Sequence, residues 1–546
     1  MNTPEQDQNS QKNESVRSAG VVGLAVMGSR LLGLVREKVI ALFFAAGVAA
    51  DALNVAFRIP NMLRDLFAEG VLSKAFITTF TATETEDGTD AAWRLANRTL
   101  NFFGIILAAI TLLGVYFTPE IVGLITGGKG FDAVLDPGEQ FGASSKRELT
   151  ILLTRIMFPF LALVSFAAIA MGVLNSKKIF GVPAWASSFF NITSLIVGVA
   201  GYYFMPMIGW HPAAGMAFGF LAGGAAQFAF QIPTLHKIGF RYQPLFRFND
   251  PRLKQVLRLM APAILGASAL QINVFMNTIF ASEGEGWITW LTRAFRLLHL
   301  PIGVFGVAIS TVALPNLARL VAENKLDDFK SSFQDSFQLV LFFALPATIG
   351  LMLLAEPFCR LIFEGGQTTP VDTAATASAL KMYAIGLCGF SAIKIVTDGF
   401  YAFQDTRTPV LVSLGTIALN ITLNAILIYK YGAGHEAIAM VTAISVSLNF
   451  VTLTVLLPRK SGKLGFAQMA PGFLRLFIAA TGLAVIVEAT RWLIEQRFGN
   501  AALSAQFAEL FAPIILGAAG YFIICKWLKV KALSQLLGAL GKRKRN

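Results

Sequence analysis

The chain has 546 residues, of which 55% are hydrophobic and only 14% are charged, and its mean hydropathy is +0.62. Soluble globular chains usually carry about a quarter charged residues, so this composition excludes an ordinary soluble protein. The formal net charge of +13 requires no nucleic-acid partner, because basic loops beside an anionic membrane leaflet account for it.

Apolar runs long enough to cross a hydrocarbon core of about 30 Å recur along the chain. A spanning segment satisfies its own backbone hydrogen bonds when it is helical, and the short alternating strands of a membrane barrel are absent from the sequence. We therefore expect an all-α polytopic membrane protein. About 14 transmembrane helices are predicted, at residues 18–45, 50–81, 95–117, 149–174, 180–206, 211–235, 255–281, 287–319, 334–354, 373–403, 409–430, 436–457, 471–493 and 507–528.

The Lys and Arg residues of the connections predict the orientation of the chain. They are concentrated in the N-terminal segment, the even-numbered connections and the C-terminal tail, including Lys177, Lys178, Lys237, Arg241, Arg247, Arg252, Lys254, Arg319, Lys325, Arg407, Arg459, Lys460, Lys463 and the run 542–545. Because basic loops stay in the cytoplasm, we expect a multi-pass protein of the cytoplasmic membrane with both termini inside.

Two short motifs occur twice. The triplet Ala-Phe-Arg at 56–58 recurs at 294–296, and Asn-Ile-Thr at 191–193 recurs at 420–422. An even number of spans separates the copies, which predicts two pseudo-symmetric six-helix lobes of the same orientation around a central cavity, as alternating access requires. The predicted divisions are a cytoplasmic tail (1–17), an N-lobe (18–237), a C-lobe (238–458), two additional C-terminal helices (459–530) and a basic cytoplasmic tail (531–546).

Charged residues lie deep in predicted spans one, two and eight, where a central Arg or Asp costs about 2.5–3.5 kcal/mol on insertion scales. They are Arg30, Arg36, Glu37 and Lys38, then Asp51, Arg58, Arg64, Asp65, Glu69 and Lys74, and finally Arg293 and Arg296. At about 1.5 Å per residue, Arg30 lies about 18 Å into span one and Arg64 about 21 Å into span two. An aqueous cavity shared by these side chains is the arrangement of lowest cost.

Two interpretations of the cluster remain open. The arginines could pair with the acidic residues as ties between helices, although buried ion pairs are often neutral for stability. Alternatively, the excess of basic over acidic residues binds an anion, for which Arg is suited because its planar guanidinium forms bidentate hydrogen bonds and keeps its charge when desolvated. We favour anion binding for the cluster as a whole.

Signals of enzymatic chemistry are absent from the sequence. The four histidines have no metal-ligand spacing, and no Walker A, G-x-S-x-G or H-E-x-x-H motif occurs. We therefore expect a transporter without catalytic residues, metal site or cofactor, and no ATP-driven pump.

Several motifs resemble the MurJ/MviN lipid II flippases of the MOP exporter superfamily. They are SRLLGLVRE at 29–37, ADA at 50–52, FRIPN at 57–61, LRDLFAEG at 63–70, RIMFP at 155–159, PAILG at 262–266, NTIFAS at 277–282, GFYA at 399–402 and QDTRTP at 404–409. The resemblance covers almost the whole chain after about residue 15, and the paired motifs of spans one and two are specific.

The resemblance implies a flippase that moves lipid II, an undecaprenyl-diphosphate-linked peptidoglycan precursor, from the inner to the outer leaflet for cell-wall synthesis. It implies two lobes in a V shape and a groove for the lipid tail beside the two C-terminal helices. By motif, the substrate-binding positions are Arg30, Arg36, Asp51, Arg64 and Arg296, with Glu37, Arg58, Glu69 and Lys394 as secondary candidates. Membrane lipids and cell-wall synthesis proteins are the further partners to consider.

The sequence departs from the family pattern at two places. Many relatives have a second basic residue where this chain has Asp65, which weakens or reshapes the local positive field. Some members resemble sodium-coupled carriers with an acidic residue in span eleven, where this chain has Asn420 and Asn424. A sodium site is therefore in doubt, and membrane potential or protons stay open as the driving force. The alternative function is that of another MOP flippase, such as an O-antigen exporter.

Overall fold

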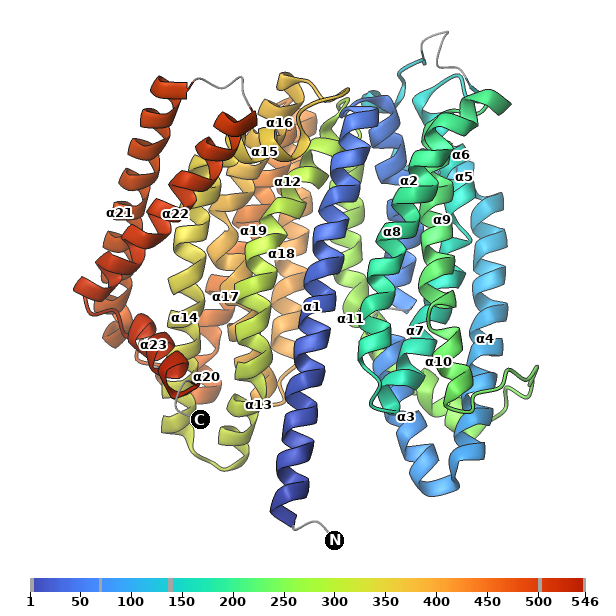
Figure 1. The fold of residues 1–546 in the computed structure, drawn as a ribbon, viewed down its shortest axis with the longest axis horizontal. Coiled ribbons are helices and arrows are strands. Elements are labelled where there is room, and N and C mark those ends of the chain that lie inside the picture. Colours follow the sequence, from blue (N-terminus) through green and yellow to red (C-terminus); the bar gives the residue numbers. More distant parts are fainter. Residues whose placement is uncertain (1–3, 68–70, 136–140, 499–502, 544–546) are drawn as a thin grey trace. The chain divides into compact units, whose positions relative to one another are not determined.

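The computed structural model describes residues 4–67, 71–135, 141–498 and 503–543, and within these ranges it contains helices and no strand. The predicted all-α class is confirmed. The chain divides into two compact units, unit 1 (Met1–Ile288) and unit 2 (Thr289–Asn546); in Figure 1, which is coloured along the sequence, unit 1 runs from blue to green and unit 2 from yellow-green to red. The predicted lobe boundary at 237/238 comes from the sequence repeat and stays a prediction.

Unit 1 is a helical bundle (Figure 1). Its helices are α1 (Pro4–Phe44), α2 (Val48–Phe67), α3 (Val71–Asp87), α4 (Thr89–Tyr116), α5 (Thr118–Ile125), α6 (Lys146–Met157), α7 (Phe160–Ser176), α8 (Gly181–Phe204), α9 (Ala213–Ala229), α10 (Ile232–Lys237) and α11 (Pro251–Ala281), with short 3₁₀ turns at Lys129–Phe131 and Met205–Ile208.

Helices α8 and α9 approach each other at backbone distance. A Cβ atom built on Gly201 would lie 2.5 Å from the Cα of Gly215, and one on Gly219 would lie 2.5 Å from the carbonyl oxygen of Ser194. Small residues allow such contact between membrane helices, where packing replaces the hydrophobic effect as the source of association. This tight pair presents the aromatic rings of Phe190 and Phe220 toward α1.

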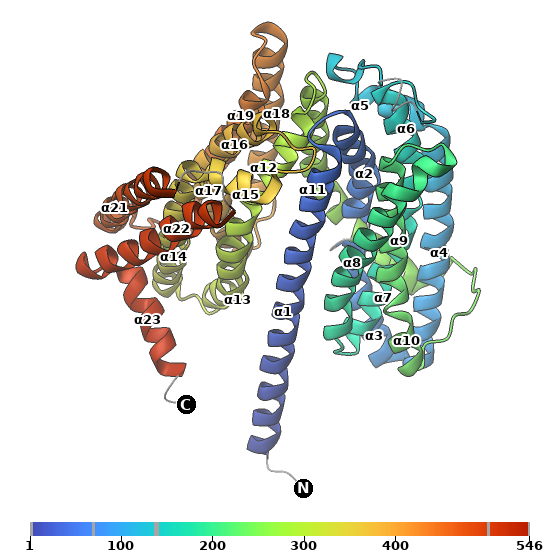
Figure 2. The same ribbon diagram turned by 45° about the horizontal axis from the view of Figure 1, so that its top comes forward.

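Unit 2 contains α12 (Trp287–Pro301, which starts at the junction), α13 (Ala308–Ala322), α14 (Leu326–Leu353), α15 (Ala355–Phe363), α16 (Pro370–Ile385), α17 (Leu387–Ala402), α18 (Arg407–Ala425), α19 (His435–Leu456), α20 (Pro458–Ser461), α21 (Phe466–Phe498), α22 (Leu503–Trp527) and α23 (Lys531–Arg543). Ile302–Val307 and Ile426–Lys430 are π-helical. Figure 2 shows α21 and α22 as a pair at one flank of this unit, followed by α23.

Among the described residues, ten helices or joined helices are long and apolar enough to cross a membrane, and the bent pair α16–α17 makes eleven. The predicted span at 373–403 is this pair, bent by 40°. A Cβ on Gly386 at the bend would lie 2.8 Å from the Cα of Ala443. The other three predicted spans fall on α1, on α2 with α3, and on α11, so the number of fourteen stays a prediction.

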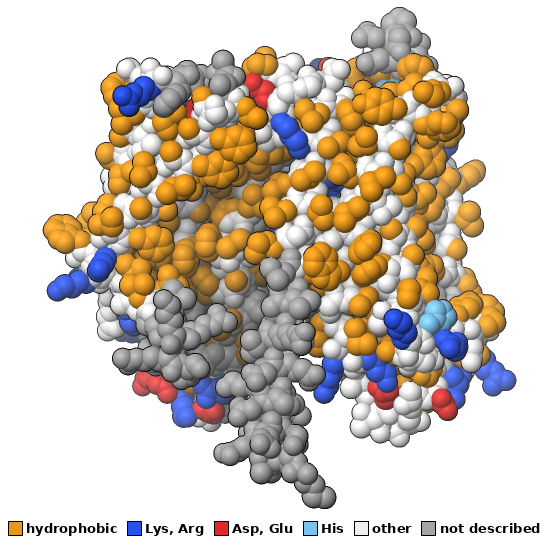
Figure 3. All heavy atoms as spheres, viewed as in Figure 1, with side chains coloured by type: hydrophobic (Ala, Val, Ile, Leu, Met, Phe, Trp, Pro, Cys, Tyr) orange, Lys and Arg blue, Asp and Glu red, His pale blue; other side chains and the backbone are white. Residues whose placement is uncertain are grey.

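Large apolar side chains are exposed on the flanks of both units, as Figure 3 shows in orange. Leu112 on α4 is 72% exposed, and Val312 on α13 is 76% exposed. Soluble proteins rarely expose contiguous apolar surface on this scale, whereas a membrane helix faces lipid with it.

The repeated triplet has matching environments in the two units. Ala56 and Ala294 are both fully buried. Phe57 contacts the rings of Phe160 and Phe220 in unit 1, and Phe295 contacts Tyr383 and Phe390 in unit 2. The same short sequence therefore forms the same kind of aromatic packing in each unit.

Candidate functional site

Arg36 lies inside unit 1 against two aromatic rings. Its guanidinium carbon is 5.3 Å from the ring centroid of Phe190 and 5.0 Å from that of Phe220. One guanidinium nitrogen is 3.8 Å from the carboxylate of Glu37, and both charged side chains are buried. A cation over aromatic faces is stabilised by the ring quadrupoles, so Arg36 supplies positive potential from within the helix packing.

Arg30 lies on α1 two turns before Arg36, and its side chain is exposed. The adjacent Ser29 is held by α8, because the side-chain amide of Asn191 donates to both the carbonyl and the hydroxyl oxygen of Ser29, at 3.1 and 3.2 Å. A fixed helix next to an accessible guanidinium is suited to contact with a ligand.

Asp51 forms a buried ion pair that sequence reasoning missed. Its Oδ2 is 2.8 Å from the Nζ of Lys146, and neither side chain is exposed. The same carboxylate oxygen accepts a hydrogen bond from the backbone N–H of Gly286, and Lys146 donates to the carbonyl of Gly130. Asp51 is therefore shielded from ligands in this structure, and its predicted substrate contact stays a prediction.

Arg64 near the end of α2 is held by its neighbour Asp65. The guanidinium donates through Nε and Nη2 to Oδ1 of Asp65, at 3.3 and 3.0 Å. The other carboxylate oxygen of Asp65 accepts from the side-chain amide of Gln271 on α11. Both charged side chains are partly exposed, at 21% and 29%, so a ligand could reach Arg64 but would compete with Asp65.

Arg58 is tied to α11 as well, because its Nη1 donates to the hydroxyl of Thr278 at 2.6 Å. Unit 1 thus contains Arg30, Arg36, Arg58 and Arg64 on two successive helices, with α11 fixing the α2 members. The secondary candidate Glu69 lies outside the described residues.

Arg296 lies on α12 in unit 2 and is half-buried. One turn earlier, Arg293 is buried, with its guanidinium 5.4 Å from the ring centroid of Phe363 and 3.5 Å from the hydroxyl of Thr368. The neighbouring Trp290 donates to Asp372. These contacts fix Arg293 in the packing and leave Arg296 as the more accessible arginine of the helix.

Lys394 on α17 is exposed, and a buried carboxylate lies one turn after it. Asp398 accepts a hydrogen bond from the hydroxyl of Ser310 on α13. Residues four apart on a helix are neighbours, so Asp398 adds negative charge beside Lys394. Its burial depends on the packing of α13 against α17, which a single sequence does not reveal.

No group of three or more His, Cys, Asp or Glu side chains in the described ranges is placed to hold a metal ion. The two asparagines of α18 are buried, and the side-chain amide of Asn424 donates to the side-chain oxygen of Asn420.

An apolar pocket of about 370 Å³ lies in unit 2 between α14, α21 and α22. Its lining includes Phe343 and Gly350 on α14, Leu483 on α21, and Gly517 and Ala518 on α22. The pocket lies where the two additional C-terminal helices pack on the rest of unit 2.

Comparison with known proteins identifies the family. The family model for lipid II flippase MurJ matches residues 40–508. A probable lipid II flippase MurJ from Vibrio cholerae is 36% identical, over 80% of this chain and 82% of its own length. The lipid II flippase MurJ of Burkholderia cenocepacia is 30% identical, over 90% of this chain and 93% of its own. A solved structure of lipid II flippase MurJ in an inward closed conformation has the same fold, with a TM-score of 0.73, 24% identity, and coverage of 92% of this chain and 97% of that one. The chain therefore belongs to the lipid II flippase MurJ family.

Proposed function

We propose that this chain flips lipid II from the inner to the outer leaflet of the bacterial cytoplasmic membrane by alternating access. The observation that carries the proposal is its similarity, over most of its length, to proteins named as lipid II flippases. Such a protein is a transporter, and its product is the translocated lipid rather than a new covalent compound.

The arginines of α1 and α2 support a diphosphate ligand. Arg30 is exposed and Arg64 is partly exposed, so both guanidinium groups can reach an anion. Arg36 is buried in the packing, and Arg58 is partly buried and donates to Thr278; both raise the local positive potential. We propose that Arg30, Arg64 and Arg296 contact the diphosphate, which accepts bidentate hydrogen bonds from Arg.

The apolar pocket beside α21 and α22 supports a second part of the proposal, the polyprenyl tail. The tail is a long hydrocarbon, and its lowest-cost position is an apolar groove open to lipid. Phe343, Gly350, Leu483 and Ala518 provide such a surface. We propose that the tail lies along this groove while the headgroup is translocated.

We further propose that both termini face the cytoplasm, that the membrane potential or a proton gradient drives the cycle, and that cell-wall synthesis proteins are partners. The basic connections support the orientation. The pair Asn420 and Asn424 offers no carboxylate to a sodium ion, which favours the other two driving forces.

The test is genetic replacement. A bacterium whose native lipid II flippase can be depleted should grow with this chain in its place, and should fail with well-expressed Arg30→Ala, Arg64→Ala or Arg296→Ala variants. Arg94→Ala, an exposed arginine on α4, serves as the matched control and should rescue. Failure of the intact chain to restore growth, or restored growth with all three variants, would contradict the proposal. The experiment also tests the alternative function, because an O-antigen exporter would not restore growth.

A further inference from the structure

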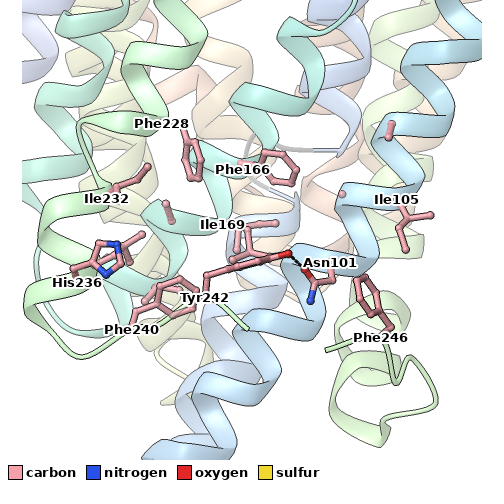
Figure 4. A pocket seen from close by; sticks show the side chains of 16 residues that line it. Asn101, Ile105, Phe166, Ile169, Phe228, Ile232, His236, Phe240, Tyr242 and Phe246 are labelled. Carbon is pink, nitrogen blue, oxygen red and sulfur yellow. Dashed lines mark hydrogen bonds between the residues drawn. The ribbon is translucent and has the colours of Figure 1, made fainter. Parts of the chain in front are cut away.

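A second apolar pocket lies wholly within unit 1 and has a volume of about 580 Å³. Its walls come from α4, α7, α9 and α10 and from the segment 238–250 that joins α10 to α11. Figure 4 shows Phe166 and Phe228 at one end, and Phe240, Tyr242 and Phe246 toward the other. Pockets that bind small molecules measure about 300–1,000 Å³, so this one can hold a large apolar group.

The connecting segment is fixed in place by two asparagines of α4. The side-chain amide of Asn97 donates to the carbonyl of Arg241 at 3.0 Å, and its side-chain oxygen accepts from the backbone of Gln243 at 2.8 Å. Asn101 donates to the carbonyls of Gln243 and Leu245. Both asparagines are buried. Buried hydrogen bonds therefore hold the segment 238–250 in place as a wall of the pocket. The pocket is thus a fixed feature of the folded protein.

The pocket has one polar end. There the hydroxyl of Tyr242 donates to the side-chain oxygen of Asn101 at 2.8 Å, drawn as a dashed line in Figure 4. Tyr242 and Phe246 are 61% and 59% exposed. Tyr side chains are enriched at the level of lipid headgroups, because their rings are amphipathic. From Asn101, the lining of α4 continues through Ile105 to Ala108, about 10 Å farther along the helix axis at 1.5 Å per residue.

Three exposed basic residues adjoin the pocket lining in the sequence. They are Lys237, Arg241 and Arg247, each next to a pocket-lining residue. The acidic residues nearby are paired with other bases, because Asp250 pairs with Arg98, and Glu86 and Asp87 pair with Arg252. Within the ranges that the structure describes, none of these three basic residues forms an ion pair with an acidic side chain, and Arg241 instead donates to the imidazole and carbonyl of His236.

We propose that this pocket binds an anionic glycerophospholipid of the surrounding leaflet, with an acyl chain between α4 and α7 and the phosphate beside Lys237, Arg241 and Arg247. A basic, aromatic end joined to an apolar end matches a negatively charged headgroup joined to a hydrocarbon chain. None of the arginines assigned to the diphosphate lines the pocket. The bound lipid would therefore be a structural or regulatory ligand, separate from the transported one.

The proposal is tested with the full chain in neutral detergent, using phosphatidylglycerol that carries a photoreactive group on one acyl chain. Labelling should map to α4 and α7 at the pocket. Ala108→Trp places an indole at the exposed mouth and should lower labelling about tenfold. Leu112→Trp is the matched control, since Leu112 is exposed on the same helix and does not line the pocket, and it should label like the unmodified chain.

A second experiment distinguishes recognition of the lipid headgroup from recognition of its acyl chain. Phosphatidylglycerol should label the pocket more strongly than a phosphatidylcholine with the same photoreactive chain. In the Lys237→Gln/Arg247→Gln variant this preference should fall about fivefold for each charge removed. Equal labelling by the two lipids in the unmodified chain, or equal loss in Ala108→Trp and Leu112→Trp, would overturn the proposal. Displacement of the probe by undecaprenyl phosphate but not by unlabelled phosphatidylglycerol would also overturn it, in favour of a polyprenyl site.

Discussion

Asp51 on α2 and Lys146 at the start of α6 form an ion pair with an Oδ2–Nζ distance of 2.8 Å, and neither side chain is exposed to solvent. The pair also binds the backbone N–H of Gly286 and the carbonyl of Gly130, while Lys146 lies 4.3 Å from the ring centroid of Phe131. Four parts of unit 1, at Asp51, at Gly130 and Phe131, at Lys146 and at Gly286, therefore meet at one pair of charges.

Breaking this pair should strongly destabilise unit 1. Asp51→Ala leaves the ammonium group of Lys146 buried without its carboxylate, and Lys146→Ala leaves the carboxylate, so each should cost about 3–5 kcal/mol. The double variant removes both charges and should cost less than the sum of the single variants. Thermal unfolding of the purified protein in detergent measures the three differences.

The control is the exposed pair of Arg147 and Asp132, whose side chains are 38% and 66% exposed. Asp132→Ala should cost no more than about 1 kcal/mol, as is usual for pairs in contact with water. Additive losses for Asp51 and Lys146 would show that the two charges do not stabilise each other.

The second prediction concerns the carboxylate that occupies Arg64. Asp65→Asn should strengthen binding of a diphosphate lipid by the purified protein, because it removes the negative charge that competes for Arg64, whereas Arg64→Ala should weaken it. For a partly exposed pair the gain is about 1 kcal/mol, or about fivefold in the dissociation constant. Glu86→Gln, which removes an acid from the exposed pair with Arg252, should leave binding unchanged. Weaker binding by Asp65→Asn would show that Asp65 positions Arg64 rather than competing for it.

The third prediction concerns the start of α18, within the QDTRTP motif. Asp405 accepts hydrogen bonds from the backbone N–H groups of Arg407 and Thr408 and from the hydroxyl of Thr408, and it pairs with Lys460 at 3.2 Å. The backbone hydrogen bond from Thr408 holds the pKa of this carboxyl below its usual 3.8. Removing such a cap costs about 1 kcal/mol.

Because the folded-state pKa of Asp405 is lowered, its stabilising effect is present above pH 3.8 and is lost as the pH falls through the folded-state value. The melting temperature of Asp405→Ala should therefore lie below that of the unmodified chain at pH 7, and the difference should shrink toward pH 3. Asp405→Asn keeps the capping oxygen and should be intermediate at pH 7. A difference that is constant with pH would contradict a role for the ionised carboxylate.

The helices and the arginines of α1 and α2 could be predicted from the sequence because hydropathy and charge are local properties. The partner of Asp51 could not, since Lys146 is distant in sequence and lies in a region that reads as a connection. Arg36 shows the same limit: its depth in the membrane follows from helix geometry, but Phe190 and Phe220 come from helices whose close approach depends on the glycines of α8 and α9. Asp65 was the exception, because its negative charge alone indicated a weaker positive potential around Arg64.

The fourth prediction tests the groove for the lipid tail. A Cβ on Gly350 meets no atom within 4 Å, so Gly350→Phe should fill the pocket without disturbing its walls. Transport of a substrate with the full polyprenyl tail should fall several-fold, whereas an analogue with a short farnesyl tail should be affected less. Gly415→Phe on α18 is the matched control, because its Cβ is equally free and Gly415 does not line the pocket. Equal effects of both substitutions on both substrates would exclude the groove as the tail site.

The fifth prediction concerns how α22 is attached to unit 2. Arg360 on α15 binds Glu509 of α22 at 3.2 Å and also contacts Glu356 at 2.7 Å and Glu364 at 4.0 Å. Arg360→Ala removes the cation that these three carboxylates share, so it should destabilise the attachment by about 3 kcal/mol. Glu509→Gln keeps a hydrogen-bond acceptor and should cost less.

Amide hydrogen exchange of residues 503–527 measures this attachment directly. Exchange should accelerate in Arg360→Ala, and the double variant Arg360→Ala/Glu509→Gln should recover part of the protection because one of the repelling carboxylates is gone. Arg319→Ala, which breaks an exposed pair with Glu323 elsewhere in unit 2, should leave exchange in α22 unchanged. If the double variant exchanged faster than Arg360→Ala, the repulsion among the carboxylates would not be what loosens α22, and hydrogen bonding by Glu509 would be the stronger contribution.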